Sequence, residues 1–223
     1  LREYQSRRSQ FGAALASHLG LVGAAVGSSL LFGGAIALWL QRYPRAQKGS
    51  IGLLSFIQTI PSLALFGLLI APLSYLSAQF PLLQQLNIRG IGWAPALLAL
   101  IAYSLLPIVR NTCVALQEVE AGVIESARGM GMSPAQVFLQ VRLPLAMPLI
   151  IEGVRVTSIQ AIGLTAVAAL IGAGGFGTFI FQGLGQSAMD LIILGALPIV
   201  VLALLADGLF SLLAERFSSG ARR

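Results

Sequence analysis

Long runs without a charged side chain dominate the pattern of hydrophobic and polar positions. Lys, Arg, Asp and Glu are all absent from residues 9–41, 49–88, 90–109 and 156–189. A helix needs about 20 mostly apolar residues to cross the hydrocarbon core of a bilayer. The pattern predicts five spanning helices, over residues 17–40, 50–76, 93–110, 143–170 and 191–213. The predicted fold class is therefore all-α, a polytopic membrane protein.

Prolines indicate where two of these helices depart from a straight rod. The second and fourth predicted helices are longer than a bilayer requires, so each needs a tilt or a break. Pro61 and Pro72 lie inside the second. Pro144 and Pro148 open the fourth, where a missing amide proton costs least.

Composition supports a membrane protein and excludes several other classes. The chain is 57% hydrophobic and 10% charged, whereas soluble domains carry about 25% charged residues. A net charge of +6 does not indicate nucleic-acid binding, because the basic residues lie at predicted membrane borders and form no stripe beside aromatic side chains. The single Cys113 and the single His18 are too few for a disulfide framework, a metal cluster or a nucleophile with its base.

Basic residues in the short loops predict the orientation, since Lys and Arg concentrate on the cytoplasmic side of a membrane. Nine of them follow the first, third and fifth predicted helices: Arg42, Arg45, Lys48, Arg110, Arg128, Arg142, Arg216, Arg222 and Arg223. The alternate loops contain only Arg89. The first set of loops, together with a tail at residues 215–223, is therefore predicted to be cytoplasmic.

The N-terminal segment does not fit this orientation simply. Five crossings and a cytoplasmic C-terminus place the N-terminus outside the cell, whereas Arg2, Arg7 and Arg8 argue against that placement. Either a further helix precedes residue 1, or residues 1–16 form an amphipathic helix on the outer surface. We favour the amphipathic helix.

Ionisable side chains inside predicted spans are costly and usually face the bundle interior or water. Glu152 and Arg155 are one helical turn apart in the fourth helix, and Asp207 lies in the fifth. We expect Arg155 to pair with Asp207, Glu152 or both in a buried cluster, because an unpaired buried charge is destabilising. Both a structural role and a role in gating fit such a cluster.

Uncharged polar and helix-breaking residues within the spans are candidates for a substrate path. These residues are Gln58, Pro61, Tyr103 and Gln160. A water-filled lumen explains such groups at membrane depth. Hydrogen bonds between helices explain them equally well.

Residues 119–142, between the third and fourth predicted helices, are predicted to form short cytoplasmic helices. Ser133 can cap a helix, Pro134 suits its first turn, and Gln136 completes a capping box. Gly131 supplies the turn before it. An apolar face would fill a groove on a partner or pack on the chain's own bundle. Its residues are Met130, Met132, Val137 and Phe138.

The spacing within this stretch resembles the EAA loop of permease subunits in binding-protein-dependent ABC importers. The sequence ESARGMGMSPAQVFLQVRLP begins with an acidic-small-small triplet and reaches a glycine after three residues. An aliphatic residue and Leu-Pro come nine residues later. The matching positions are Glu125, Ser126, Ala127, Gly131, Val141, Leu143 and Pro144. Ser126 replaces the usual Ala, and Val141 replaces the commoner Ile.

Three other segments resemble permeases for glycine betaine, choline, carnitine and related osmoprotectants, and the first two of them narrow the resemblance to this group. They are QTIPSLALFGLLIAPL at 58–73, PALLALIAYSLLPIVRNT at 95–112 and GVRVTSIQAIGLTAVAALIGAGGFGTFIFQGL at 153–184. The likeness therefore covers nearly the whole chain.

The resemblance implies a five-helix type I ABC importer core with its transmembrane domain over residues 17–214, preceded by a segment such as 1–16. The loop docks a separate cytoplasmic ATPase, which binds ATP and Mg, so the chain binds no cofactor and is not an enzyme. The implied coupling residues are Glu125, Ser126, Ala127, Gly131, Met132, Val141, Leu143 and Pro144. Further implied partners are a second permease copy, identical or similar, and an external substrate-binding protein or domain.

The implied function is import of a quaternary ammonium osmoprotectant across a bacterial-type inner membrane by alternating access. Permeases for amino acids or other trimethylated amines are the alternative within the family. An ion-coupled transporter is disfavoured, because such a protein has no ATPase to dock. Residues 172–177 fit a G-x-G-x-x-G pattern, but a predicted spanning helix rather than a strand precedes them, which excludes a dinucleotide site.

Overall fold

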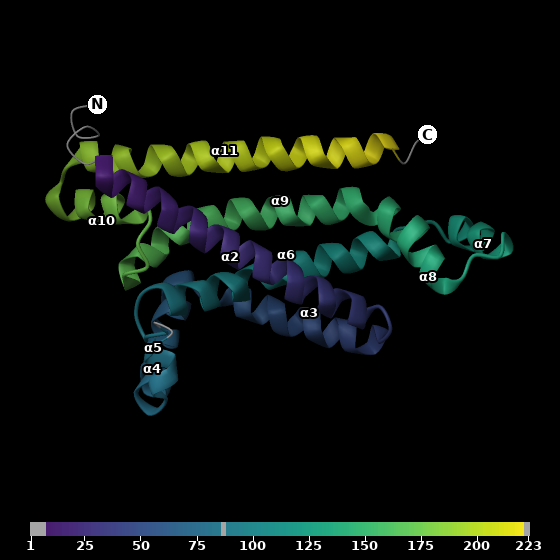
Figure 1. Cartoon of the computed structure of the whole chain (residues 1–223), viewed down its shortest axis with the longest axis horizontal. Coiled ribbons are helices and arrows are strands. Elements are labelled where there is room, and N and C mark those ends of the chain that lie inside the picture. The colour runs from purple at the N-terminus through teal and green to yellow at the C-terminus, as the bar shows by residue number, and fades with distance from the viewer. Residues whose placement is uncertain (1–7, 86–87, 221–223) are drawn as a thin grey trace.

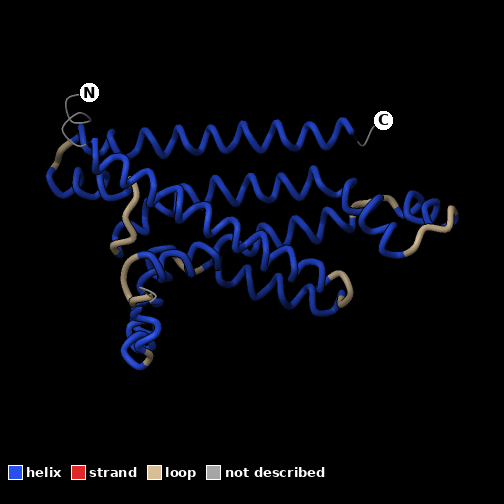
Figure 2. Tube along the Cα trace, viewed as in Figure 1, coloured by secondary structure: helices blue, strands red, loops and turns tan. Residues whose placement is uncertain are grey.

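The computed structural model describes residues 8–85 and 88–220, and these residues confirm the all-α class. Helices joined by short loops account for the architecture, and none of the described residues forms a strand (Figure 2). The predicted segment 1–16 lies partly outside this range, at residues 1–7. Its described part, residues 8–16, continues into the first helix without a break.

The long helices are α2 (Arg8–Leu40), α3 (Pro44–Thr59), α4 (Ser62–Gln79), α6 (Trp93–Gln117), α9 (Leu143–Ala168) and α11 (Met189–Gly220). Shorter helices connect them: α5 (Pro81–Gln85), α7 (Ala121–Gly129), α8 (Pro134–Gln136) and α10 (Gly177–Gln186). A π-helical turn, η1 (Val137–Arg142), joins α8 to α9, and a 3-10 turn, η2 (Ala169–Ile171), ends α9.

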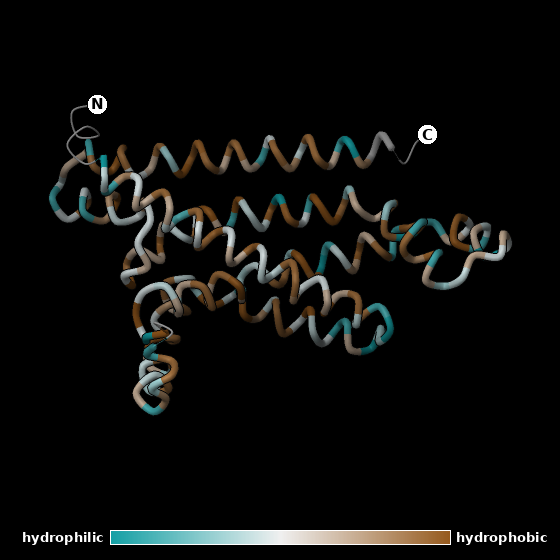
Figure 3. Tube along the Cα trace, viewed as in Figure 1, coloured by the Kyte–Doolittle hydropathy of each residue, from teal (hydrophilic) through white to brown (hydrophobic). Residues whose placement is uncertain are grey.

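Helix α6 lies at the centre of the bundle. It packs against α2, α3 and α9; α2 also contacts α9, and α9 in turn packs against α11 (Figure 1). Helices α7 and α8 lie at one end of the bundle, near the C-terminal end of α11, and α10 lies at the opposite end. Apolar residues follow the long helices, while hydrophilic colours gather at their ends (Figure 3).

Five helices in the described part of the chain are long and apolar enough to cross a membrane, as predicted. They are Arg8–Leu40, Ser62–Gln79, Trp93–Gln117, Pro134–Ile171 and Met189–Phe217. Several boundaries differ from the prediction. The third helix continues to Gln117, so Arg110 lies inside it rather than in a loop.

The second predicted span, residues 50–76, is wrong as a single helix. It is broken at Ile60 and Pro61, whose backbones are both extended. A proline disfavours the helical conformation of the residue before it, which explains a break at this site. Helix α3 runs beside α6, whereas α4 turns away from the bundle in Figure 1.

The fourth span begins earlier than residue 143, because α8, η1 and α9 form one continuous helix from Pro134. The Leu143 amide donates to the Phe138 carbonyl, five residues earlier, and so widens one turn. Pro144 has no amide proton for the carbonyl four residues before it. The wide turn therefore coincides with the position where α-helical hydrogen bonding is already interrupted.

Candidate coupling segment and substrate path

The segment formed by α7, α8 and their connecting turn projects beyond the end of the bundle (Figure 1). Glu125 and Ser126 are exposed on α7, and the Ser126 hydroxyl donates to the Gly122 carbonyl. Ala127 is only 2% exposed and anchors α7 through its inner face. The predicted acidic-small-small triplet thus presents its first two residues to the surroundings.

Gly131 ends α7 in a left-handed conformation with a φ of +84°. Its amide donates to the Arg128 carbonyl at 2.9 Å, and the Met132 amide donates to the Ala127 carbonyl at 3.3 Å. These two bonds form a Schellman motif, in which glycine is preferred because it has no Cβ atom to strain the left-handed residue. The backbone therefore explains the glycine at position 131.

The predicted capping box at the start of α8 is confirmed. The Ser133 amide donates to Gln136 Oε1 at 2.8 Å, and the Gln136 amide donates to Ser133 Oγ at 3.4 Å. Pro134 occupies the first turn, as predicted. Hydrogen bonds therefore fix the backbone on both sides of the turn between α7 and α8.

The predicted apolar face is only partly correct. Met130 is 77% exposed, whereas Val137 is buried and Phe138 packs beside Leu116 and Ala146. Both inward-facing residues belong to the continuous helix that leads into α9, so the bundle itself covers them. The large apolar side chains that remain exposed are Val123 and Met130 in the segment and Leu139 in η1.

The eight predicted coupling residues occupy two places. Glu125, Ser126, Ala127, Gly131 and Met132 belong to α7 and the turn that follows it. Val141 lies in η1, and Leu143 and Pro144 open α9. The second group therefore lies at the root of the segment, where it joins the spanning helix.

Arg142 forms hydrogen bonds at the junction between the segment and α9, a role that the sequence did not indicate. Its Nε donates to the Leu116 carbonyl at 2.8 Å, and its Nη2 donates to Gln41 Oε1 at 3.3 Å. Gln41 Nε2 in turn donates to the Cys113 carbonyl at 3.1 Å. These hydrogen bonds link the end of α2, α6 and η1, which are far apart in sequence. From the sequence alone, Arg142 indicated only the orientation in the membrane.

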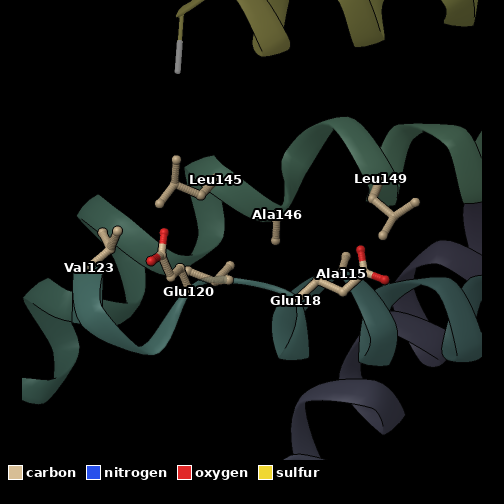
Figure 4. A pocket seen from close by; sticks show the side chains of 8 residues that line it. Ala115, Glu118, Glu120, Val123, Leu145, Ala146 and Leu149 are labelled. Atoms are coloured by element: carbon tan, nitrogen blue, oxygen red, sulfur yellow. The ribbon is translucent and has the colours of Figure 1, made fainter. Parts of the chain in front are cut away.

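A recess of about 320 Å³ separates the start of α7 from the first turns of α9 (Figure 4). Glu118 and Glu120 line one side, and Leu145 and Leu149 line the other. The segment therefore meets the bundle partly across a hollow, and Ala127 supplies the buried contact.

Three of the four predicted path residues meet at the break between α3 and α4. Gln58 Nε2 donates to the Tyr103 carbonyl at 2.8 Å, and the Tyr103 hydroxyl donates to the Ile60 carbonyl. Pro61 follows directly. Tyr103 is 4% exposed. These interactions match the alternative role, hydrogen bonding between helices, and Tyr103 lines no open path in this conformation.

Gln58 and Gln160 do line an open recess of about 510 Å³ between α3, α6 and α9. Its other lining residues are Leu106, Pro107, Arg110, Asn111, Val114 and Val156. Two of the four path candidates thus face one hollow, and Pro61 and Tyr103 are not part of its lining.

The predicted pairing of Arg155 is confirmed with both acids. Arg155 Nε lies 2.7 Å from Asp207 Oδ1, and Arg155 Nη1 lies 3.1 Å from Glu152 Oε1. The expectation of burial is wrong, because the side chains of Arg155, Glu152 and Asp207 are 28%, 42% and 40% exposed. The bonds link α9 to α11 at the margin of their contact rather than inside the core.

The comparison that decides the family covers most of the chain. The model of the family described as "Binding-protein-dependent transport system inner membrane component" matches residues 23–219. The chain belongs to this family. The chain is accordingly a permease subunit, and with five apolar helices it is a multi-pass inner-membrane protein.

Two curated bacterial relatives of this permease resemble it along most of their length. It is 40% identical to the osmoprotectant import permease protein OsmW of Salmonella typhimurium, over 86% of this chain and 84% of the relative. It is 37% identical to the carnitine transport permease protein OpuCB of Listeria monocytogenes, over 88% of this chain and 84% of the relative.

A solved structure agrees on the fold. The MetNI methionine ABC transporter in inward-facing conformations matches with a TM-score of 0.78 at 20% identity, over 94% of this chain and 97% of the other. This similarity confirms the predicted type I ABC importer fold. The permease is a membrane component of its transport system, and its role is not catalytic.

Proposed function

We propose that this permease imports a quaternary ammonium osmoprotectant by alternating access, driven by a separate ATPase. The observation that carries the substrate class is 40% identity over most of both chains to a relative named as an osmoprotectant import permease. A second relative, named for carnitine transport, points to the same chemistry. A permease for an amino acid or another trimethylated amine is the remaining candidate within the family.

In this proposal the end of the bundle that holds α7 and α8 is cytoplasmic. The turn between α2 and α3 and the C-terminal end of α11 lie at that same end (Figure 1). Arg110 lies inside α6 and is not counted. Among the described residues, six other basic side chains belong to elements at this end, against Arg8 and Arg89 at the other: Arg42, Arg45, Lys48, Arg128, Arg142 and Arg216. The imbalance still supports a cytoplasmic C-terminus.

The ATPase would dock on the projecting segment. Glu125 on α7 and Met130 directly after this helix are exposed, and the Schellman motif and the capping box hold the shape of the turn between α7 and α8. Arg142 would carry a displacement of the tip into α9 and α6, since it hydrogen-bonds at that junction. ATP and Mg would bind the ATPase and not this chain.

A second permease copy, identical or similar, would complete the path. The recess beside Gln58 and Gln160 is open at the side of the molecule, so one copy does not enclose it. An external substrate-binding protein or domain would deliver substrate to the opposite end of the bundle, near α10 (Figure 1).

Reconstitution of the complete importer in proteoliposomes tests the proposal. Uptake of labelled glycine betaine, carnitine or choline should require ATP on the cytoplasmic side and should not follow the membrane potential. Uptake that follows the potential and ignores ATP would instead identify an ion-coupled transporter. ATP-dependent uptake of an amino acid, with none of these three compounds carried, would change the proposed substrate class and leave the ATP-driven mechanism unchanged.

A substitution at Gly131 tests the docking assignment. Gly131→Trp strains the left-handed residue and adds bulk at the tip, so we expect ATP hydrolysis to be uncoupled from uptake. Gly129→Trp is the matched control, because it adds the same side chain at a helical position where a Cβ atom likewise meets no atom within 4 Å. Normal uptake by Gly131→Trp would place the ATPase contact elsewhere.

A further inference from the structure

Arg110 contributes a positive charge to the recess between α3, α6 and α9. Helix α6 continues to Gln117, seven residues further on, so Arg110 lies about 10 Å before the end of this helix at 1.5 Å per residue. Its side chain is exposed, and it lines the recess together with Gln58 and Gln160. An arginine at this depth needs an explanation, because charges inside spans are costly.

Within the described chain, no acid neutralises this guanidinium. Helix α9 contains Glu152, and helix α11 contains Asp190, Asp207 and Glu215; of these, Glu152 and Asp207 bind Arg155. None of the described residues that line the recess is acidic. No hydrogen bond or ion pair within the described part of the chain involves Arg110. The recess therefore presents an uncompensated positive charge.

The other polar groups of the recess suit the same ligand as the arginine. Asn111, Gln58 and Gln160 carry amide groups that can donate hydrogen bonds. A guanidinium binds a carboxylate through two parallel hydrogen bonds, which is geometrically specific as well as strong. A fixed positive charge also disfavours a ligand that is only a cation.

We propose that Arg110 is a specificity residue that binds the carboxylate of a zwitterionic quaternary ammonium substrate as it passes through the recess. Glycine betaine and carnitine carry such a carboxylate, and choline does not. The inference rests on the proposed function and deepens it: the permease itself, in addition to the binding protein, discriminates betaine-type zwitterions from bare quaternary cations.

Initial uptake rates in the complete reconstituted importer test this proposal. Glycine betaine, carnitine and choline are each supplied at saturating concentration with one unaltered binding protein, so a change in their ratio originates in the permease. Loss of the charge-assisted hydrogen bonds in Arg110→Met should lower the rates for the two zwitterions at least about tenfold. The choline rate, where one is measurable, should stay the same or rise. Arg110→Lys should retain part of the zwitterion rates.

Two measurements separate this role from a structural one. Arg45→Met removes the same charge at an exposed position outside the recess and should leave the rates unchanged. ATP hydrolysis stimulated by loaded binding protein should persist in Arg110→Met. If Arg110→Met does not fold, Arg110→Gln, neutral but polar, takes its place with the same expected losses.

Several outcomes overturn the inference. One is an equal fall in the uptake rates of the zwitterions and of choline in Arg110→Met. Another is a wild-type importer that carries choline but neither zwitterion. Unchanged zwitterion rates in both neutral variants also contradict it, while the proposed function stands. If the wild type carries none of the three compounds although it carries another substrate in an ATP-dependent way, the proposed osmoprotectant function fails, and the role of Arg110 fails with it.

Discussion

Gly153 of α9 lies so close to Asn111 of α6 that a Cβ atom at position 153 would be 2.7 Å from the Cβ of Asn111. Real side chains do not approach this closely, so only glycine allows the two helices their present separation. Asn111 also lines the recess that contains Arg110. The Gly153–Asn111 contact therefore sets the position of one recess wall relative to α9.

A larger residue at position 153 should force α6 and α9 apart. We expect Gly153→Leu to lower the free energy of unfolding by about 1–3 kcal/mol, as overpacking of a tight contact does, and to reduce uptake because the recess changes shape. Thermal melting in detergent measures the first effect. Gly163→Leu on the same helix is the control, since a Cβ atom there meets nothing within 4 Å. Equal melting temperatures for the two variants would contradict the prediction.

The Arg155–Asp207 bond joins α9 to α11, and its coupling can be measured. Arg155→Ala should destabilise the fold or alter gating, because it leaves Glu152 and Asp207 without their shared cation. Adding Asp207→Ala should restore part of that loss. A double-mutant cycle in detergent melting gives the coupling energy. Strictly additive losses would mean that the two residues are not energetic partners, and Glu152 alone would remain.

Bulk placed in the recess should obstruct transport. Gln160→Trp and Gln58→Trp should abolish uptake with the protein still present in membranes, because both side chains line the same hollow. Gln58→Trp also removes the hydrogen bond to the Tyr103 carbonyl and should melt at a lower temperature than Gln160→Trp. Gly163→Trp, on an open face of α9, serves as the control. Full uptake by both recess variants would place the path elsewhere.

Cysteine labelling should establish the orientation. On a Cys113→Ala background, an impermeant reagent applied from outside should label a cysteine at position 89 and should not label one at 45 or 125. The reason is the surplus of basic residues at the end of the bundle that holds α7. Cys113 is buried, so its removal leaves the surface unchanged. Outside labelling of position 45 would reverse the model.

Local chemistry made several features predictable from sequence. Charge-free runs identified the spanning helices, because the hydrocarbon core of a bilayer disfavours charged side chains on every face of a helix. The capping box at Ser133 and the turn at Gly131 depend on neighbours within five residues, so their geometry follows from the local sequence. The pairing of Arg155 with Glu152 was likewise predictable, since side chains one turn apart on a helix meet.

Contacts between distant segments decided the rest. Pro61 predicted a break in the second span. The contacts with α6 decided that α3 runs along this helix, whereas α4 meets the bundle through Phe66 and then turns away from it. Arg110 and Arg142 are indistinguishable in sequence as basic residues near a helix end. Helix α6 continues past Arg110 and exposes it to a recess, whereas Arg142 meets the Leu116 carbonyl and Gln41. The sequence determined which segments enter the membrane, because transfer into lipid depends on composition, and the tertiary structure decided what each polar group touches, because that depends on helices brought together from far along the chain.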